Sequence, residues 1–292
     1  MRAYIHDFLM EYNYPDSAIS TLISTYDKIY ANPETAKILD DMLSLYEADH
    51  NCDYEKVLLG TNTLSEILNI HEYTIELLIF ICMSRRLREL YVKYNLPVEY
   101  YKKSMADLKY KLDECLLVFG IVGSFVAPWF CGFFNLTRFG MGRLQFELTP
   151  FGSNYEKNGI KLTPETKVIN IHIPRSGEPL TEESCREAYL LAKSFWKDHV
   201  SQENCPFVCH SWLLDPHLEE FLPKHTNTYR FYKSFDIYNS IPDKNRTSLW
   251  RLFDTMEQNP DKLPADTSMR RAFIDYLKNG GRLGMGSGVL FV

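Results

Sequence analysis

Residues 1–119 carry apolar side chains at the three- and four-residue spacing of amphipathic helices. Asparagine and proline interrupt this spacing at Asn32-Pro33 and at Asn95-Leu96-Pro97. The pattern predicts five helices: the first two follow Pro15 and Pro33, and the others cover Tyr54 to Ile70, Glu72 to Tyr94 and Val98 to Val118. Because this half lacks the alternation of strands, we expect an all-helical N-terminal domain of residues 1–120.

Short alternating segments replace the helical spacing after Gly120, and they predict strands. These strands are Arg143 to Leu148 (with Leu136 to Arg138 as a candidate hairpin partner), Lys167 to Ile173, Phe207 to Leu214 and Tyr229 to Tyr238. Between the second and third lies a long helix that Thr181 caps, with the apolar stripe Cys185, Ala188, Tyr189, Ala192, Phe195 and Trp196. A strand, a helix and a second apolar strand in this order predict a right-handed crossover between parallel neighbours.

The C-terminal segment combines a helix with a run of glycines. The helix covers Met269 to Lys278 and is terminated by Gly280. Gly281 to Gly288 is predicted to be a loop that leads into a last edge strand, Val289 to Val292. Residues 121–292 should therefore form a mixed β-sheet flanked by helices, which gives an α+β chain of two domains.

Composition and charge narrow the classes of function. A net charge of −6 without clustered Lys and Arg argues against a nucleic-acid-binding role. Seven cysteines without a paired framework indicate reduced thiols. Asp7 and Glu11 occupy the place where a signal peptide would have its apolar core. We therefore expect a cytoplasmic protein.

One uncharged stretch, Cys115 to Leu136, is long enough to raise the question of a membrane span. Glycines, Pro128 and Asn135 divide it into two short pieces. The alternative is a buried helix end followed by an apolar loop, and we expect this arrangement in place of a membrane anchor.

Three segments of the C-terminal half resemble a bacterial family of N-acyltransferases, in which a helical N-terminal domain precedes a GNAT-like C-terminal domain. They are Gly142 to Glu147 (GRLQFE), Ile169 to Gly177 (INIHIPRSG) and Phe207 to Leu214 (FVCHSWLL). The glycine-rich ending and the order of the predicted elements are also similar to this family. The resemblance covers residues 120–292 well and the helical half more loosely. It implies transfer of an acyl group from acetyl-CoA or another acyl-CoA to an amine of a small acceptor.

The resemblance also implies a place for the cofactor pyrophosphate, on backbone N–H groups between a strand and the next helix. The residues of this place are Ile173, Arg175, Ser176, Gly177 and Thr181, with the Ile173 amide assigned to the carbonyl oxygen that gains negative charge. Two features depart from the family pattern. Pro179 has no N–H to offer, and the acids Glu178, Glu182 and Glu183 oppose a phosphate. An ordinary capped loop, with acids that favour the helix dipole, is the alternative.

His172 and His210 are the candidate catalytic bases, because GNAT sheets part between the two strands that carry them here. Buried imidazoles that only link the sheet by hydrogen bonds are the alternative. Glu147 is a candidate second base, or else a member of a structural ion pair. The tyrosine that GNAT proteins use as leaving-group acid has no counterpart in residues 215–222, and His217 or Tyr232 is a speculative substitute.

Two other chemistries are disfavoured. Cys209 and His210 cannot form a catalytic dyad, because consecutive strand residues point to opposite faces. We expect no metal, because Cys205 and Cys209 are spaced poorly for one tetrahedral site. The main rival hypothesis is a GNAT-like module that binds a ligand or protein without catalysis.

Overall fold

The computed structural model describes residues 1–243 and 248–292, which form two compact units, Met1–Gly140 and Met141–Val292. The first unit extends past the predicted boundary at residue 120. It does so because the 3-10 helix η1 (Ala127–Phe130) and α8 (Cys131–Phe134) pack on α6 (Glu72–Lys93) of this unit. The Phe80 ring of α6 lies 5.2 Å from that of Phe130, and the Tyr46 hydroxyl donates to the Phe134 carbonyl oxygen at 3.0 Å.

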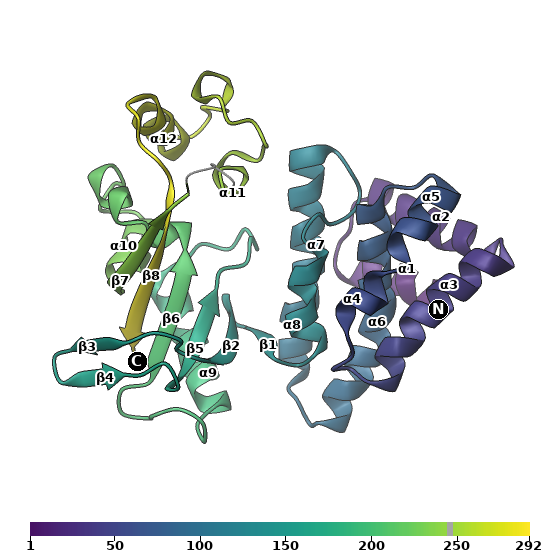
Figure 1. Ribbon diagram of the computed structural model, residues 1–292, viewed down its shortest axis with the longest axis horizontal. Coiled ribbons are helices and arrows are strands. Elements are labelled where there is room, and N and C mark those ends of the chain that lie inside the picture. The colour runs from purple at the N-terminus through teal and green to yellow at the C-terminus, as the bar shows by residue number, and fades with distance from the viewer. Residues whose placement is uncertain (244–247) are drawn as a thin grey trace. The chain divides into compact units, whose positions relative to one another are not determined.

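Up to residue 137, before strand β1 (Arg138–Met141) begins, the described secondary structure of the first unit is helical (Figure 1). Its other helices are α1 (Arg2–Glu11), α2 (Asp16–Tyr30), α3 (Pro33–Ala48), α4 (Tyr54–Leu58), α5 (Thr61–Leu68) and α7 (Val98–Phe119). Helix α6 is central: it packs against α1, α2, α3, α5 and α7. Every residue from Leu77 to Ser84 is buried, as expected for a helix surrounded by others.

Two details of the helical unit correct the sequence interpretation. The single helix predicted from Tyr54 to Ile70 is divided into α4 and α5 at Gly60. Gly60 lies so close to α3 that a Cβ there would be 2.6 Å from Met42 Sδ, and glycine weakens a helix in any case. Helix α1 was not predicted.

The uncharged stretch from Cys115 is interrupted as its composition indicates. Helix α7 ends at Gly120, which adopts the left-handed φ of 69° that glycine tolerates best. Pro128 then lies in η1. Across residues 1–243 and 248–292, no helix is both long and apolar enough to cross a bilayer.

The second unit is built on a six-stranded mixed sheet in the order β1-β2-β5-β6-β8-β7 (Figure 1). Its strands are β1 (Arg138–Met141), β2 (Leu144–Pro150), β5 (Lys167–His172), β6 (Pro206–Ser211), β7 (Asp236–Pro242) and β8 (Gly284–Phe291). A separate hairpin joins β3 (Tyr155–Lys157) to β4 (Ile160–Leu162). The predicted helical connection between parallel neighbours is confirmed: α9 (Glu182–Phe195) connects β5 and β6.

Both faces of the sheet are covered by apolar side chains. On one face, the Tyr189 ring of α9 lies 5.2 Å from that of Phe207 and 6.3 Å from that of Phe146. On the other, Val208 and Val289 pack in one cluster with Leu162 of the small hairpin. A sheet covered on both sides needs long apolar stretches in its central strands, which explains the apolar sequence of β6.

The predicted strand from Tyr229 to Tyr238 is wrong, because α10 (Asn227–Lys233) occupies its first half and β7 its second. The Thr226 hydroxyl caps α10 by accepting from the Tyr229 amide. Phe231 and Tyr232 are both buried, and two adjacent buried side chains fit a helix better than a half-buried strand.

The glycine-rich ending is also a strand, and not the loop that its composition suggested. Strand β8 begins at Gly284 and lies between β6 and β7, so it is an interior strand and not an edge. A Cβ at Gly286 would lie 1.8 Å from the Leu214 carbonyl oxygen. Glycine is needed here because another main chain passes directly over the strand.

A second apolar cluster is formed by the segments around β7 and β8. These are η2 (Trp212–Leu214), η3 (Pro216–Glu220), α11 (Trp250–Phe253) and α12 (Ser268–Lys278), and η4 (Pro260–Lys262) contacts α12. Leu218, Phe253 and Phe273 are buried in this cluster. The predicted strand to Leu214 stops earlier, since the Ser211 hydroxyl accepts from the Leu213 amide and starts the η2 turn.

Candidate active site

A row of polar residues crosses the sheet on the face opposite α9. Gln145 of β2 pairs in register with His172 of β5, and His210 of β6 pairs with Ser287 of β8. Residues at the same level of neighbouring strands point to the same face. The sheet therefore presents two imidazoles and a hydroxyl side by side.

The parallel pairing of β5 and β6 ends one residue before the two histidines. Its last pair is Ile171 with Cys209, although β5 continues to His172 and β6 to Ser211. His172 and His210 are thus the first residues beyond the ladder. Main-chain groups at such an opening can bind a ligand instead of the neighbouring strand.

His172 is paired with Glu147 across β2 and β5. The distance from His172 Nε2 to Glu147 Oε2 is 2.7 Å, and the side chains are 19% and 20% exposed. A carboxylate can only accept, so Nε2 donates, and in the neutral imidazole the lone pair is on Nδ1. The sequence placed both residues among the candidates but did not predict this contact.

His210 has a hydroxyl partner and not a carboxylate. Its Nδ1 lies 2.8 Å from the Ser287 Oγ. The residue is exposed, yet desolvation of its imidazole lowers the pKa of His210 below the ordinary value. Cys209, its neighbour in sequence, is buried on the other face, and burial raises the pKa of this thiol to about 12. A Cys209–His210 dyad is therefore absent, as the strand geometry predicted.

The loop that follows β5 is held in place by Arg143. The guanidinium donates from Nε to the Glu178 carbonyl oxygen at 2.9 Å and from Nη1 to the Pro174 carbonyl oxygen at 3.1 Å. Gly177 has a φ of 78°, and no atom lies within 4 Å of the position of a Cβ there. The main chain at Gly177 therefore turns sharply with open space beside it.

Thr181 caps α9, as predicted. Its hydroxyl oxygen accepts from the Ser184 amide at 3.1 Å, and its carbonyl oxygen accepts from the Cys185 amide at 3.0 Å. Helix geometry supplies no internal acceptor for the two amides before these, those of Glu182 and Glu183. These amides and the helix dipole favour an anion, while the two carboxylates oppose one.

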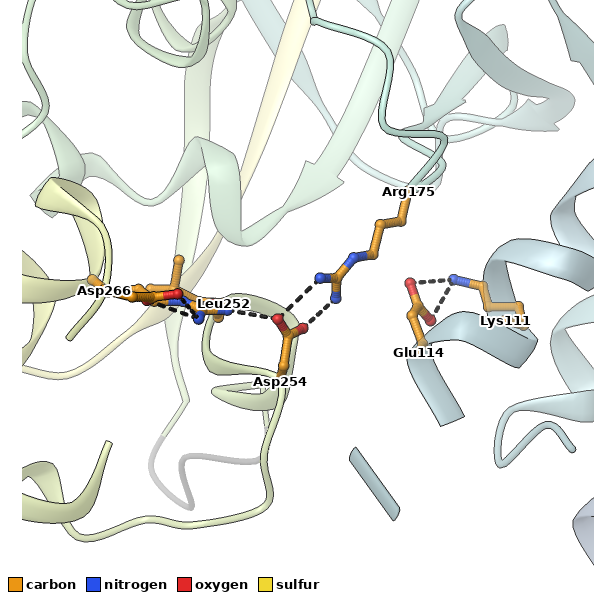
Figure 2. Close-up of polar contacts among 7 residues, drawn as sticks. Lys111, Glu114, Arg175, Leu252, Asp254 and Asp266 are labelled. Carbon is orange, nitrogen blue, oxygen red and sulfur yellow. Dashed lines mark hydrogen bonds and ion pairs between the residues drawn. The ribbon is translucent and has the colours of Figure 1, made fainter. Parts of the chain in front are cut away.

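Arg175 has a carboxylate partner from a distant segment. It forms a two-point hydrogen-bonded ion pair with Asp254, whose Oδ2 lies 3.0 Å from Arg175 Nη2 (Figure 2). Asp254 also accepts from Arg270 Nη2 at 2.6 Å, and Arg270 pairs in turn with Asp266. Although desolvation raises the pKa of Asp254, the hydrogen bonds from Arg175 and Arg270 outweigh it and lower the pKa. The residue assigned to a phosphate thus already binds an anion.

Sequence reasoning missed a pocket of about 320 Å³ beside the start of α9. Its walls are largely apolar and come from α9, α10 and the end of β8; they include Leu180, Cys185, Tyr189, Phe231 and Leu290. Arg186 and Arg230 also line it, and both are exposed. Within residues 1–243 and 248–292 neither guanidinium forms an ion pair, so the pocket offers an apolar interior with two cations.

The remaining candidates lie in other contacts. Ile173 follows β5 directly and is partly exposed. His217 Nδ1 lies 3.0 Å from the buried Asp215, and the Tyr232 hydroxyl lies 3.3 Å from Glu219. Over the described part of the chain, no three His, Cys, Asp or Glu side chains gather as a metal site would require.

Two family models together match nearly all of the sequence. Residues 3–136 match the N-acyltransferase N-terminal domain, and residues 138–290 match the GNAT-like C-terminal domain. A comparison with curated proteins gives no match.

The fold is also similar to solved acyltransferase structures. One, in complex with decanoyl-CoA and teicoplanin, is 20% identical with a TM-score of 0.72 over 98% of this chain and 86% of that one. Another, in complex with decanoyl-CoA, is 18% identical with a TM-score of 0.74 over 97% and 86%. A mutant acyltransferase in complex with octanoyl-CoA is 20% identical with a TM-score of 0.73 over 98% and 87%. At this identity the likeness concerns the fold.

Proposed function

We propose that this chain, which belongs to the family of proteins with a GNAT-like C-terminal domain, transfers an acyl group from an acyl-CoA to an amine of a small acceptor molecule. The observation that carries the proposal is the His172–Glu147 pair at the point where β5 and β6 stop pairing. This pair combines a base with a carboxylate that stabilises the proton it receives.

The acyl-CoA supplies an activated acyl thioester, and the chain's own residues handle the proton and the charge. As the amine nitrogen bonds to the acyl carbon, His172 Nδ1 accepts the proton that the amine loses, and Glu147 stabilises the resulting imidazolium. The carbon–sulfur bond then breaks, and the CoA thiolate leaves and takes up the proton from the imidazolium. His210 and the Ile173 amide donate hydrogen bonds to the carbonyl oxygen, where negative charge develops.

The phosphates are assigned to the start of α9. The open main chain at Gly177 and the amides of the first helical turn receive the pyrophosphate, with Ser176 and Thr181 shaping the loop. The pocket beside this turn receives the phosphorylated nucleoside: Tyr189 and Phe231 offer apolar walls to the base, and Arg186 and Arg230 offer guanidinium groups to the phosphate.

The similar structures support this assignment by their contents. They contain decanoyl-CoA or octanoyl-CoA, and one also contains teicoplanin. We extend to this chain the use of an acyl-CoA and of a small organic acceptor. We leave the acyl length and the acceptor to the experiment.

Binding is the first test, because it needs no acceptor. Calorimetric titration with CoA, acetyl-CoA, octanoyl-CoA and decanoyl-CoA should show saturable heat for at least one of them. Exchanging either Arg186 or Arg230 for Gln should weaken binding by about tenfold or more, since each lost charged hydrogen bond costs about 1.5–3 kcal/mol. Arg282→Gln, at another exposed arginine, is the matched control. Absence of heat with every thioester at millimolar concentration would remove the proposal.

Turnover is the second test. Release of the CoA thiol is measured against a panel of primary amines and matched alcohols, and we expect activity with amines. His172→Ala should lower kcat by about 10²–10⁴-fold, the usual contribution of a general base. His172→Ala turnover equal to wild type would reject His172 as the base.

A module that binds a ligand without catalysis is the second candidate. The engagement of Arg175 by Asp254 and the acids at the start of α9 favour it, since both reduce the positive potential for a phosphate. Tight binding of CoA without thiol release from any amine on the panel would support this candidate over the transferase.

A further inference from the structure

Ser287 occupies a special position in the glycine-rich strand β8. Gly286 and Gly288 flank it and face the side where Leu214 and Phe235 come closest. Ser287 faces the other side, in register with His210, within a run of six consecutive pairs between β6 and β8. Close packing on one face thus fixes where the hydroxyl lies on the other.

The contact at 2.8 Å between Ser287 Oγ and His210 Nδ1 admits two directions. A neutral imidazole carries its hydrogen on one ring nitrogen and a lone pair on the other. If the hydroxyl donates to Nδ1, the hydrogen of His210 resides on Nε2. If the hydroxyl accepts from Nδ1, Nε2 carries the lone pair.

The surroundings of the pair favour the first direction. Ser287 is half-buried, and Nδ1 is the acceptor that lies 2.8 Å from its hydroxyl oxygen. His210 is exposed, so a hydrogen on its Nε2 can be donated to solvent or to a substrate. Desolvation also lowers the pKa of His210, which keeps the imidazole neutral and its two nitrogens distinct.

We propose that Ser287 is a positioning residue, which donates to His210 Nδ1 and thereby places the hydrogen of His210 on Nε2, directed at the acyl carbonyl oxygen. The statement that Nε2 is directed at the acyl carbonyl oxygen rests on the proposed function, whereas the statement about the tautomer does not. The opposite tautomer would present a lone pair to an oxygen that gains negative charge, which is repulsive.

The tautomer is tested on the whole chain without substrate. Histidine side chains labelled with ¹⁵N are observed by NMR at a pH where His210 is neutral, and its signals are assigned by their loss in His210→Gln. We expect Nε2 to carry the hydrogen in the wild type and in Ser287→Thr, and both tautomers to be populated in Ser287→Ala. Ser240→Ala, at an exposed serine of β7, is the control for effects of removing a serine hydroxyl elsewhere in the sheet. Identical His210 signals in wild type and Ser287→Ala would overturn the inference.

Steady-state kinetics tests whether Ser287 contributes to turnover through His210. Ser287→Ala should lower kcat by about tenfold, the value of one net hydrogen bond, while KM for the acyl-CoA stays unchanged. Ser287→Thr should restore kcat. A changed tautomer with unchanged kcat would overturn the catalytic role. If the wild type turns over no substrate, the proposed function fails, and the NMR result still decides the tautomer.

Discussion

Replacing Gly286 with alanine tests the close packing that makes the C-terminal segment an interior strand. A Cβ at this position would lie 1.8 Å from the Leu214 carbonyl oxygen and 2.3 Å from its carbonyl carbon. Cβ atoms essentially never approach another heavy atom within 3.0 Å, so the main chains of β8 and η2 would have to separate by about 1.2 Å, the difference between 3.0 and 1.8 Å.

Neither chain can move easily. Leu214 is fully buried, and the next residue, Asp215, accepts from the Gly284 amide at 2.6 Å on the same strand. Overpacking costs about 1–3 kcal/mol and more when main chain must shift. We therefore expect Gly286→Ala to lower the free energy of unfolding by about 3 kcal/mol, with a fall in Tm of roughly 6–12 °C.

Urea unfolding followed by tryptophan fluorescence measures this loss. Three of the four tryptophans, Trp196, Trp212 and Trp250, belong to the C-terminal unit. Gly284→Ala is the matched control on the same strand. Its Cβ would lie 3.0 Å from Asp215 Oδ2 and 3.2 Å from the Ile241 carbonyl oxygen, contacts that a shift of a few tenths of an ångström relieves, and we expect a loss of about 1 kcal/mol or less. A Gly286→Ala protein within about 0.5 kcal/mol of wild type, or equal to Gly284→Ala, would refute the argument.

Three further predictions concern the loop and helix α9. Because the pKa of Asp254 is lowered by folding, its contribution to stability is complete above the ordinary carboxyl pKa of about 4 and is lost as pH falls through the folded value. Asp254→Asn should therefore be less stable than wild type at pH 7, and the difference should shrink as the pH is lowered below about 4, as measured by urea unfolding over a series of pH values. Thr181→Ala should cost about 1 kcal/mol by loss of the helix cap, whereas Thr181→Ser should cost little; equal losses in the two variants would argue against a capping role. The Tyr189 hydroxyl is buried without a hydrogen bond of normal length to any described residue, with the weak Cys185 thiol as its neighbour. Tyr189→Phe should leave the unfolding free energy unchanged within about 0.5 kcal/mol or raise it, and a loss above 1 kcal/mol would reveal a partner.

The sequence predicted those parts of the fold that depend on local pattern. Helices α6 and α7 begin at the predicted residues. Pro97 marks the start of α7, and a change in the spacing of apolar residues marks the start of α6. The order of β5, α9 and β6 followed from the apolar content of two strands and a capped helix between them. These signals lie within a few residues of the elements that they specify.

The errors arose where a distant contact decided the structure. The sequence predicted a loop at Gly286. The contact that requires glycine there is with the Leu214 carbonyl oxygen, which is distant in the sequence. Arg175 could be recognised as a cation after a strand, but its partner Asp254 lies 79 residues further on. Ser287 gave no chemical signal by itself, and only the register of β8 against β6 places it beside His210.

His172 and His210 have different hydrogen-bond partners, and this difference explains how one could act as a base and the other as a hydrogen-bond donor. Glu147 accepts from His172 Nε2 and so leaves the lone pair on Nδ1, which suits a base. A serine hydroxyl that donates to His210 Nδ1 leaves the hydrogen on Nε2, which suits a donor. A carboxylate also stabilises positive charge on its imidazole, whereas a hydroxyl does so far less. Exchanging the partners would therefore exchange the roles, so the assignment of base and donor depends on Glu147 and Ser287 as much as on the histidines themselves.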